Sequence, residues 1–365
     1  MARPSWDNEM RDAAMKTLDS LQWVKGSESK AFGEEFSRYC GAIQGTPCQS
    51  GSVALWGALR LLEIGPGDEV LVPSLTYIAT ATSISLVGAT PIFVDVEPDY
   101  WCIDVSALEA ARTKRTKAVI GVHLFGQLCA PELHSWCEQN GIAYIEDAAQ
   151  AHGAMQGTSV RAGAIGDVAC FSFFPSKNLA VGGEGGMMMT KRSDLAARMA
   201  ALVNHGRDER LESHELGSNL RMSEVTASIG RIQLQRLDGW LERRRTIAEQ
   251  YREAFTNIAG IQLPKVRKNT QHAWHQYCIL TAEPELFQAN LDEKGIDSRI
   301  YYSQPCHRQG VYASHPQHNE TLPITDTISS RLVAIPIHHQ LTNGEVCRII
   351  DAVVSACSPS NGVSE

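Results

Sequence analysis

Short apolar segments alternate with amphipathic segments along the first two-thirds of the chain. The apolar runs are rich in β-branched residues and occur at 69–73, 91–96, 118–122 and 142–145. Helix-like stretches separate them, including 53–62 and 131–140. Continuous apolar strands joined by helices predict an α/β fold whose mostly parallel central sheet is flanked by helices. Ligands of such sheets bind at the carboxyl ends of the strands, where we expect Ser74, Asp147 and His123.

The pattern changes after Ser223. A long, charged amphipathic helix is predicted from there to about Phe255, and the remainder to Ala356 mixes short strands and helices with an α+β character. We therefore expect four parts. They are an N-terminal arm or helix at 1–20, a large domain at 21–250 that includes the linking helix, a smaller C-terminal α+β domain at 251–357 and a disordered tail at 358–365.

Composition limits the class of protein. The 365 residues are 43% hydrophobic, enough for the cores of two domains. A formal charge of −8 argues against nucleic acid or an anionic membrane as a partner. Ten cysteines are scattered between Cys40 and Cys357 without a CxxC pair, which is typical of reduced thiols in the cytoplasm. The chain has no apolar signal region at its start and no run long enough to span a bilayer. We expect a cytoplasmic protein with small-molecule substrates.

A lysine in an aromatic, apolar run is the main candidate for chemistry. Lys177 follows the segment 171–176, and burial of its charge is costly, so its pKa should fall and its amine should become nucleophilic. Such an amine forms Schiff bases with carbonyl cofactors. Asp147 ends a predicted buried strand, and a buried carboxylate keeps the ring nitrogen of pyridoxal phosphate (PLP) protonated. Taken singly, the lysine would more often be exposed and the aspartate a helix cap. Together with a phosphate-binding signal they predict a PLP site.

Ser50, Gly51 and Ser52 supply that phosphate signal at the start of a predicted helix. Backbone N–H groups and the helix dipole favour an anion there, although simple capping by serine is the common alternative. Ser172 is a further hydroxyl near Lys177. Tyr77 follows a strand and either stacks on a flat heteroaromatic ring or belongs to the core.

Several motifs occur in a characteristic order and spacing, namely those at 65–73, 87–91, 146–150, 172–178, 204–206 and 219–223. In these motifs the chain resembles the DegT/DnrJ/EryC1/StrS family of sugar aminotransferases, which are PLP enzymes of fold type I. The resemblance extends over nearly the whole chain.

The resemblance implies roles for the cofactor-binding residues. Lys177 would bind the cofactor covalently and later carry a proton between the substrate Cα and the cofactor's C4′. Asp147 would pair with the pyridine nitrogen, Gln150 would contact the phenolic oxygen, and Tyr77 would cover one face of the ring. The phosphate would be held by Ser50, Gly51, Ser52 and Ser172.

Other implied roles concern the substrate and the assembly. In the family, the segment of Asn219 comes from the neighbouring subunit, which implies a homodimer with composite sites. Arg221 is a candidate clamp for the carboxylate of the amino donor or for an acidic substrate group, and a solvated salt bridge is its alternative role. His307 is a candidate substrate-side residue. We predict no metal site, because His315 and His318 have no partner at ligand spacing.

The leading hypothesis is a PLP-dependent aminotransferase that converts a nucleotide-linked keto-sugar to an amino sugar, with L-glutamate as the amino donor. One alternative is a keto-cyclitol aminotransferase that uses glutamine. Another is a non-catalytic scaffold or regulator of the same fold. A dehydratase branch of the family has histidine in place of the Schiff-base lysine, and Lys177 argues against that branch.

Overall fold

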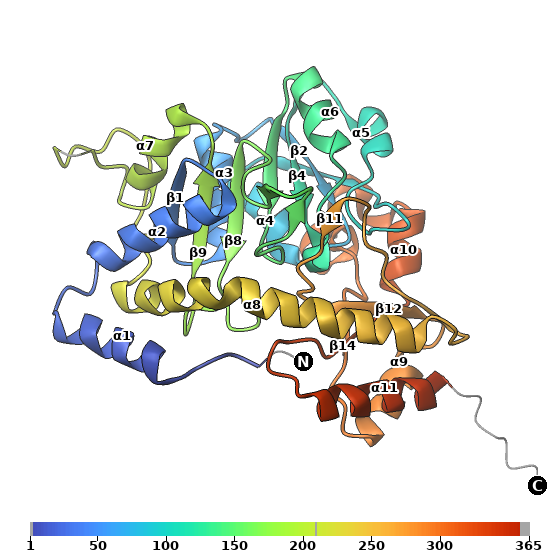
Figure 1. The fold of residues 1–365 in the computed structure, drawn as a ribbon. Helices are drawn as coiled ribbons and strands as arrows, with labels where there is room; N and C mark the ends of the chain where they lie inside the picture. The colour runs from blue at the N-terminus through green and yellow to red at the C-terminus, as the bar shows by residue number, and fades with distance from the viewer. Residues whose placement is uncertain (1–2, 209, 358–365) are drawn as a thin grey trace, which may run out of the picture.

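The structure, a computed structural model, describes residues 3–208 and 210–357. The predicted tail at 358–365 lies outside the described residues. A large α/β part and a smaller α+β part are connected by one long helix, α8 (Glu224–Phe255), which runs past both (Figure 1). The α/β prediction is confirmed. Because α8 continues to Phe255, it crosses the predicted boundary at residue 250, and the domain limits stay predictions.

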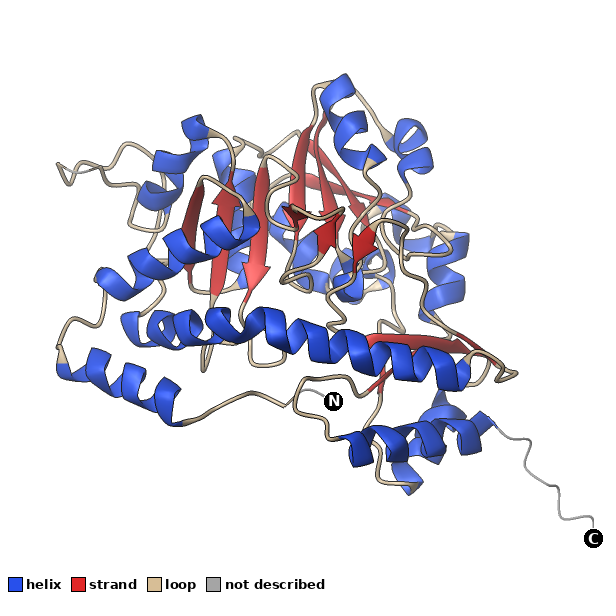
Figure 2. Cartoon of the chain, in the orientation of Figure 1, coloured by secondary structure: helices blue, strands red, loops and turns tan. Residues whose placement is uncertain are grey.

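A seven-stranded sheet forms the central layer of the large part, and helices pack against both of its faces (Figure 2). Its order is β1-β9-β8-β5-β4-β2-β3, with bounds β1 Gln44–Cys48, β2 Glu69–Pro73, β3 Thr90–Val94, β4 Thr116–Val122, β5 Ala143–Asp147, β8 Val168–Ser172 and β9 Gly186–Thr190. All neighbouring pairs from β8 to β3 are parallel, and β9 runs antiparallel to both β8 and β1. The parallel strands therefore end at one common edge.

Alternate residues of each strand pack on opposite sides of the sheet. Val70 and Val72 belong to the core under one face, and Leu71 belongs to the core under the other. The first face is covered by α3 (Gly51–Leu61), α4 (Ile78–Leu86) and α7 (Ser193–Leu202). The second is covered by α2 (Ser27–Cys40), α5 (Val105–Ala111), α6 (Glu132–Asn140) and α8. Burial on both faces explains why these strands read as continuous apolar runs.

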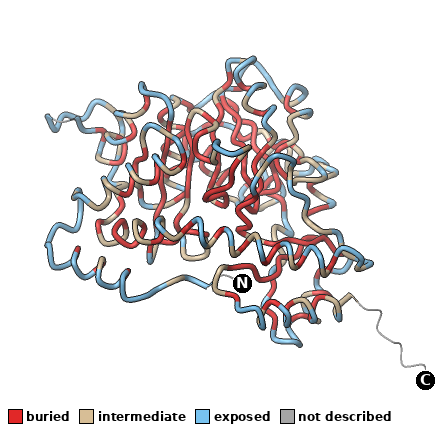
Figure 3. Tube along the Cα trace, in the orientation of Figure 1, coloured by how far each residue is buried: buried red, intermediate tan, exposed pale blue. Residues whose placement is uncertain are grey.

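Helix α1 (Asn8–Asp19) lies outside this layer and packs along α8. Only part of α1 is covered: Met10 and Ala14 contact the α8 surface, while Met15 and Leu18 are exposed. Figure 3 shows the contrast between the buried sheet strands and this largely exposed N-terminal region.

The smaller part contains a four-stranded antiparallel sheet of order β10-β12-β14-β13, with bounds β10 Ile261–Gln262, β12 Tyr277–Thr281, β14 Leu332–Ile335 and β13 Arg299–Ile300. The second half of α8, together with α9 (Pro284–Glu293) and α11 (Asn343–Cys357), forms its core. The described residues also form a three-stranded sheet of β11 (Thr270–Gln271), β6 (Met155–Gln156) and β7 (Val160–Arg161), helix α10 (Pro323–Ser329) and four short 3-10 helices at Leu124–Gly126, Cys306–Arg308, Gly310–Tyr312 and Pro316–Asn319. Within the described ranges, no helix is both long and apolar enough to cross a membrane.

Candidate active site

A cavity of about 870 Å³ opens at the edge where the parallel strands end. Most of its wall comes from loops of the large part, and the smaller part contributes His275, Gln276, Tyr301 and Tyr302. The cavity brings together nine residues that the sequence singled out: Ser50, Gly51, Ser52, Tyr77, Asp147, Gln150, Ser172, Lys177 and Arg221. Asn219 and His307 do not line it.

Lys177 lies in the loop that follows β8 and projects into this cavity. A turn fixes its backbone, whose N–H donates to the Phe174 carbonyl at 2.8 Å. The adjacent Asn178 is buried, and its side-chain amide donates to the Ala273 carbonyl at 2.7 Å. Desolvation lowers the pKa of Lys177 to about 8, and the negative charge of Asp147 opposes this shift. A substantial fraction of the amine is therefore neutral near pH 8.

Asp147 is the last residue of β5 and is only 6% exposed. Its Oδ2 accepts a hydrogen bond from Thr80 Oγ1 at 2.8 Å, and its Oδ1 accepts one from the Ala149 N–H at 3.2 Å. Burial raises its pKa, while the Thr80 bond, the Ala149 bond and the charge of Lys177 lower it. Lysine and aspartate thus influence each other's charge within one cavity.

The start of α3 provides a cradle for a small anion. Ser50 caps the helix by accepting a hydrogen bond from the Val53 N–H at 3.2 Å, which leaves its hydroxyl proton available for a ligand. A Cβ added to Gly51 would lie 2.7 Å from Ser172 Cβ, so the helix start packs directly against the end of β8. Serine hydroxyls and free N–H groups therefore converge, and the capping and phosphate-binding interpretations of Ser50 are compatible.

We predict that Gly51→Ala weakens the binding of PLP about tenfold or more, because the added methyl group displaces Ser172 at a cost typical of overpacking. Gly183→Ala is a matched control, since no atom lies within 4 Å of its added Cβ. Titration of the apoprotein with PLP measures both affinities. Equal affinities for the two variants would contradict the proposed cradle.

Gln150 has a fixed orientation. Its Oε1 accepts a hydrogen bond from the Phe125 N–H at 2.7 Å, and its Nε2 donates to the Tyr302 hydroxyl at 3.1 Å. Since a backbone donor holds the oxygen, the amide nitrogen faces Tyr302 and the cavity. Tyr77 is 59% exposed at the wall of the cavity, so it is not a core aromatic.

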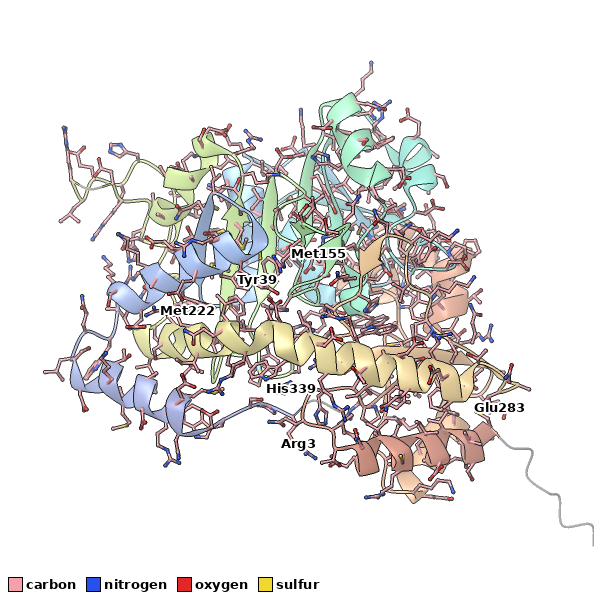
Figure 4. All side chains as sticks on the ribbon, viewed as in Figure 1. Arg3, Tyr39, Met155, Met222, Glu283 and His339 are labelled. Atoms are coloured by element: carbon pink, nitrogen blue, oxygen red, sulfur yellow. The ribbon has the colours of Figure 1, made fainter. Side chains whose placement is uncertain are left out.

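Arg221 lines the cavity and directly precedes Met222, which Figure 4 shows close to the start of α8. Its Nη1 donates to Asn204 Oδ1 at 2.7 Å, and its buried Nε has no partner among the described residues. No ion pair of Arg221 occurs within residues 3–208 and 210–357, so the salt-bridge alternative finds no support there. Asn219 lies nearby with an exposed side chain, and its carbonyl accepts a bond from Gln49 Nε2 at 2.9 Å.

The structure does not place His307, the candidate substrate-side residue, at the cavity. It is completely buried outside the cavity wall, and both of its ring nitrogens are engaged. Nδ1 lies 2.6 Å from Ser74 Oγ, and Nε2 lies 3.2 Å from the Glu320 carbonyl oxygen. His307 therefore ties the segment around residue 306 to the end of β2, which is a structural role.

Sequence reasoning missed several residues of the cavity wall. Thr80 contacts Asp147, Tyr302 contacts Gln150, and His275 presents a buried Nδ1 without a partner among the described residues. Thr76 and Thr80 are four residues apart at the carboxyl edge of the sheet, a spacing that could have indicated Thr80. Tyr302 and His275 carried no such local signal.

Comparisons with known proteins find aminotransferase relatives over nearly the whole chain. The chain is 38% identical over 340 residues to UDP-N-acetyl-3-dehydro-alpha-D-glucosamine 3-aminotransferase of Acidithiobacillus ferrooxidans, covering 93% of this chain and 91% of that protein. It is also 38% identical over 344 residues to dTDP-3-amino-3,4,6-trideoxy-alpha-D-glucose transaminase of Streptomyces venezuelae, covering 94% and 90%.

A solved structure resembles the whole fold. The crystal structure of S. venezuelae DesV in complex with a ketimine intermediate superposes with a TM-score of 0.93 at 36% identity, covering 96% of this chain and 94% of that chain. The DegT/DnrJ/EryC1/StrS aminotransferase family matches residues 4–354. With a half-buried lysine and a buried aspartate lining one cavity, in a fold shared over nearly its full length, this chain belongs to the DegT/DnrJ/EryC1/StrS aminotransferase family.

Proposed function

We propose that this aminotransferase moves an amino group from L-glutamate to the keto carbon of a nucleotide-linked sugar and so forms an amino sugar. PLP is its cofactor and supplies an aldehyde for amines and an electron sink for the carbon that exchanges its proton. The observation that carries the proposal is the placement of Lys177 and Asp147 in one cavity beside the start of α3.

The residues of the cavity fit this cofactor. A phosphate needs an anion cradle, which Ser50, Ser52 and Ser172 offer at the start of α3. A pyridinium nitrogen needs a carboxylate, which Asp147 offers in a buried position. The fixed amide nitrogen of Gln150 donates one proton to Tyr302, and its second proton would serve an acceptor oxygen on the ring.

Each group has a defined task in the transfer. The neutral amine of Lys177 would take up the proton lost by the substrate Cα and pass it to the cofactor's C4′, and a pKa of about 8 lets this amine both gain and lose a proton near neutral pH. The Asp147 carboxylate holds a proton on its partner nitrogen by charge attraction in a poorly solvated site. Arg221, with an unpartnered Nε within the described residues, is positioned to bind the carboxylate of the amino donor.

The relatives support the choice of acceptor. Both curated relatives described above are named for sugars linked to UDP or dTDP. Their identity to this chain extends over at least nine-tenths of each protein, so the parts that surround the cavity are included. We carry the nucleotide-linked sugar over to this chain on that basis.

A homodimer with composite sites is part of the proposal. Around the cavity, Tyr77 is 59% and Phe174 is 45% exposed, and Leu216, close to Asn219 in the chain, is 80% exposed. Covering such apolar side chains favours association. Asn219 would then complete the site of the second copy, which accounts for its position outside the cavity of its own chain.

Substrate trials test the proposal. With PLP bound, L-glutamate alone should yield about one 2-oxoglutarate per site, because the first half of the reaction needs no acceptor. UDP or dTDP should raise the melting temperature by a few degrees at about 100 times its dissociation constant. A keto-sugar linked to the same nucleotide should then be aminated. The absence of any nucleotide effect, together with amination of a free keto-cyclitol by glutamine, would contradict the acceptor and the donor.

A further inference from the structure

Two threonine hydroxyls form a hydrogen-bonded chain that ends on Asp147. Thr76 Oγ1 lies 3.0 Å from Thr80 Oγ1, and Thr80 Oγ1 donates to Asp147 Oδ2 at 2.8 Å. Both threonines are 1% exposed and line the cavity. A hydroxyl has one proton, and an ionised carboxylate only accepts hydrogen bonds. Thr80 therefore directs its proton to Asp147, and Thr76 directs its own proton to Thr80.

The local structure holds both hydroxyls in place. Thr80 belongs to the first turn of α4, and its N–H donates to the Tyr77 carbonyl at 3.1 Å. Thr76 precedes this turn, and its carbonyl accepts a bond from Cys306 Sγ at 3.3 Å. The chain turns between Thr76 and the start of α4, and this turn brings the two hydroxyls within 3.0 Å of each other. Their separation is thus set by the backbone.

This chain restrains the carboxylate of Asp147. Each of its oxygens has one donor, Thr80 for Oδ2 and the Ala149 N–H for Oδ1. Rotation of the carboxylate would break at least one of these bonds. Burial favours the protonated form of Asp147, and the bond from Thr80 is the strongest influence that opposes it.

We propose that Thr80, oriented by Thr76, is a positioning residue that holds the Asp147 carboxylate as an oriented anion toward the ring nitrogen of bound PLP. The inference rests on the proposed function, since it requires a cofactor with a basic ring nitrogen. Thr80 acts through Asp147. The threonine pair would keep Asp147 ionised, and so able to pair with the ring nitrogen, in a buried site that favours the neutral carboxyl group.

Valine and serine substitutions test this role. Thr80→Val keeps the shape of the side chain and removes the donor, so we expect PLP affinity to fall about tenfold, as for the loss of a hydrogen bond to a charged group. As the pH is lowered, the variant should lose its affinity for PLP at a higher pH than the wild type does. Without the Thr80 donor, the pKa of Asp147 rises and the carboxylate protonates more readily. Thr80→Ser should retain the wild-type affinity within about twofold.

Thr82→Val is the matched control. Thr82 lies on the same helix, and its hydroxyl donates to the Ile78 carbonyl at 3.2 Å, away from Asp147. We expect this variant to bind PLP with the wild-type affinity and pH profile. Absorbance titrations of the apoproteins with PLP measure both quantities. A range from about pH 5 to about pH 9 is suitable, because the pKa of Asp147 is raised and that of Lys177 is lowered from their ordinary values.

A double-mutant cycle separates positioning from general destabilisation. Thr80→Val should add no further loss of affinity in the Asp147→Asn background, because the two residues act through one bond. If Thr80→Val does not fold, Thr76→Val carries the test, with an expected loss of about threefold and the same acid-side shift. Equal binding by the Thr80→Val and Thr82→Val variants, no rescue by serine, or additive losses would overturn the role of Thr80. Failure of the wild-type protein to bind PLP would instead overturn the proposed function.

Discussion

Replacement of Lys177 by methionine should lower transaminase turnover at least about 1,000-fold, since it removes both the covalent attachment of the cofactor and the group that transfers the proton. Methionine fills a similar volume without a charge. The cradle at Ser50 and the Asp147 carboxylate remain, so PLP should still bind reversibly. Borohydride reduction followed by peptide mass analysis should find cofactor on the peptide of residue 177 in the wild-type protein and none in the variant.

Lys191→Met is the control for this prediction. The Lys191 ammonium donates to the Ala164 carbonyl at 3.1 Å and is absent from the cavity wall, so its loss should leave turnover and trapping unchanged. The assignment of Lys177 as the nucleophile would be wrong if the Lys177→Met variant retained more than about one-tenth of the wild-type turnover. It would also be wrong if borohydride still attached PLP covalently to the variant.

The sequence predicted those strands of the large sheet that are buried on both faces. Strands at 69–73 and 118–122 carry apolar residues on both faces, and they match β2 and the greater part of β4. Strand β1 was not predicted, because Gln44–Cys48 contains glycine and proline and has little β-branched character. It forms at the edge of the sheet by pairing with β9, a contact distant in sequence.

The candidate site was accessible from the sequence for a similar reason. The end of a parallel strand has a known place in the fold, so Asp147 could be assigned to the edge that the cavity occupies, whereas Ser74 and His123, assigned there for the same reason, are buried outside the cavity wall. Gln150 and Tyr302 are 152 residues apart, and His307 bonds to Ser74 over 233 residues. Such pairings depend on how the smaller part packs against the large sheet, which periodicity does not specify. This is why His307 was assigned to the substrate and Tyr302 was missed.

Replacement of Asp147 by asparagine should lower turnover about 100- to 1,000-fold, the usual cost of removing a preorganised charge from an active site. The shape of the side chain is retained. Its remaining oxygen can keep the Ala149 N–H, and the Thr80 hydroxyl can turn toward Thr76. Burial raises the pKa of Asp147, so the buried carboxylate charge destabilises the folded apoprotein. The variant lacks this charge, and its apoprotein should therefore melt no lower than the wild type. A large fall in melting temperature would show damage to the fold and contradict a purely electrostatic effect.

The same Asp147→Asn substitution should lower turnover and yet make the Lys177 amine of the apoprotein more reactive. In the apoprotein, burial lowers the pKa of Lys177 to about 8, while the Asp147 carboxylate favours the charged ammonium and holds the pKa up. Removing that carboxylate should lower the pKa further, so that more of the amine is neutral at pH 7. Reductive methylation of Lys177, followed by peptide mass analysis across pH, should therefore reach half its maximal rate at a lower pH in Asp147→Asn than in the wild type. A variant that loses turnover and yet exposes a more nucleophilic amine distinguishes the loss of a charge from misfolding, and an unchanged or raised midpoint would disprove the coupling between the two residues.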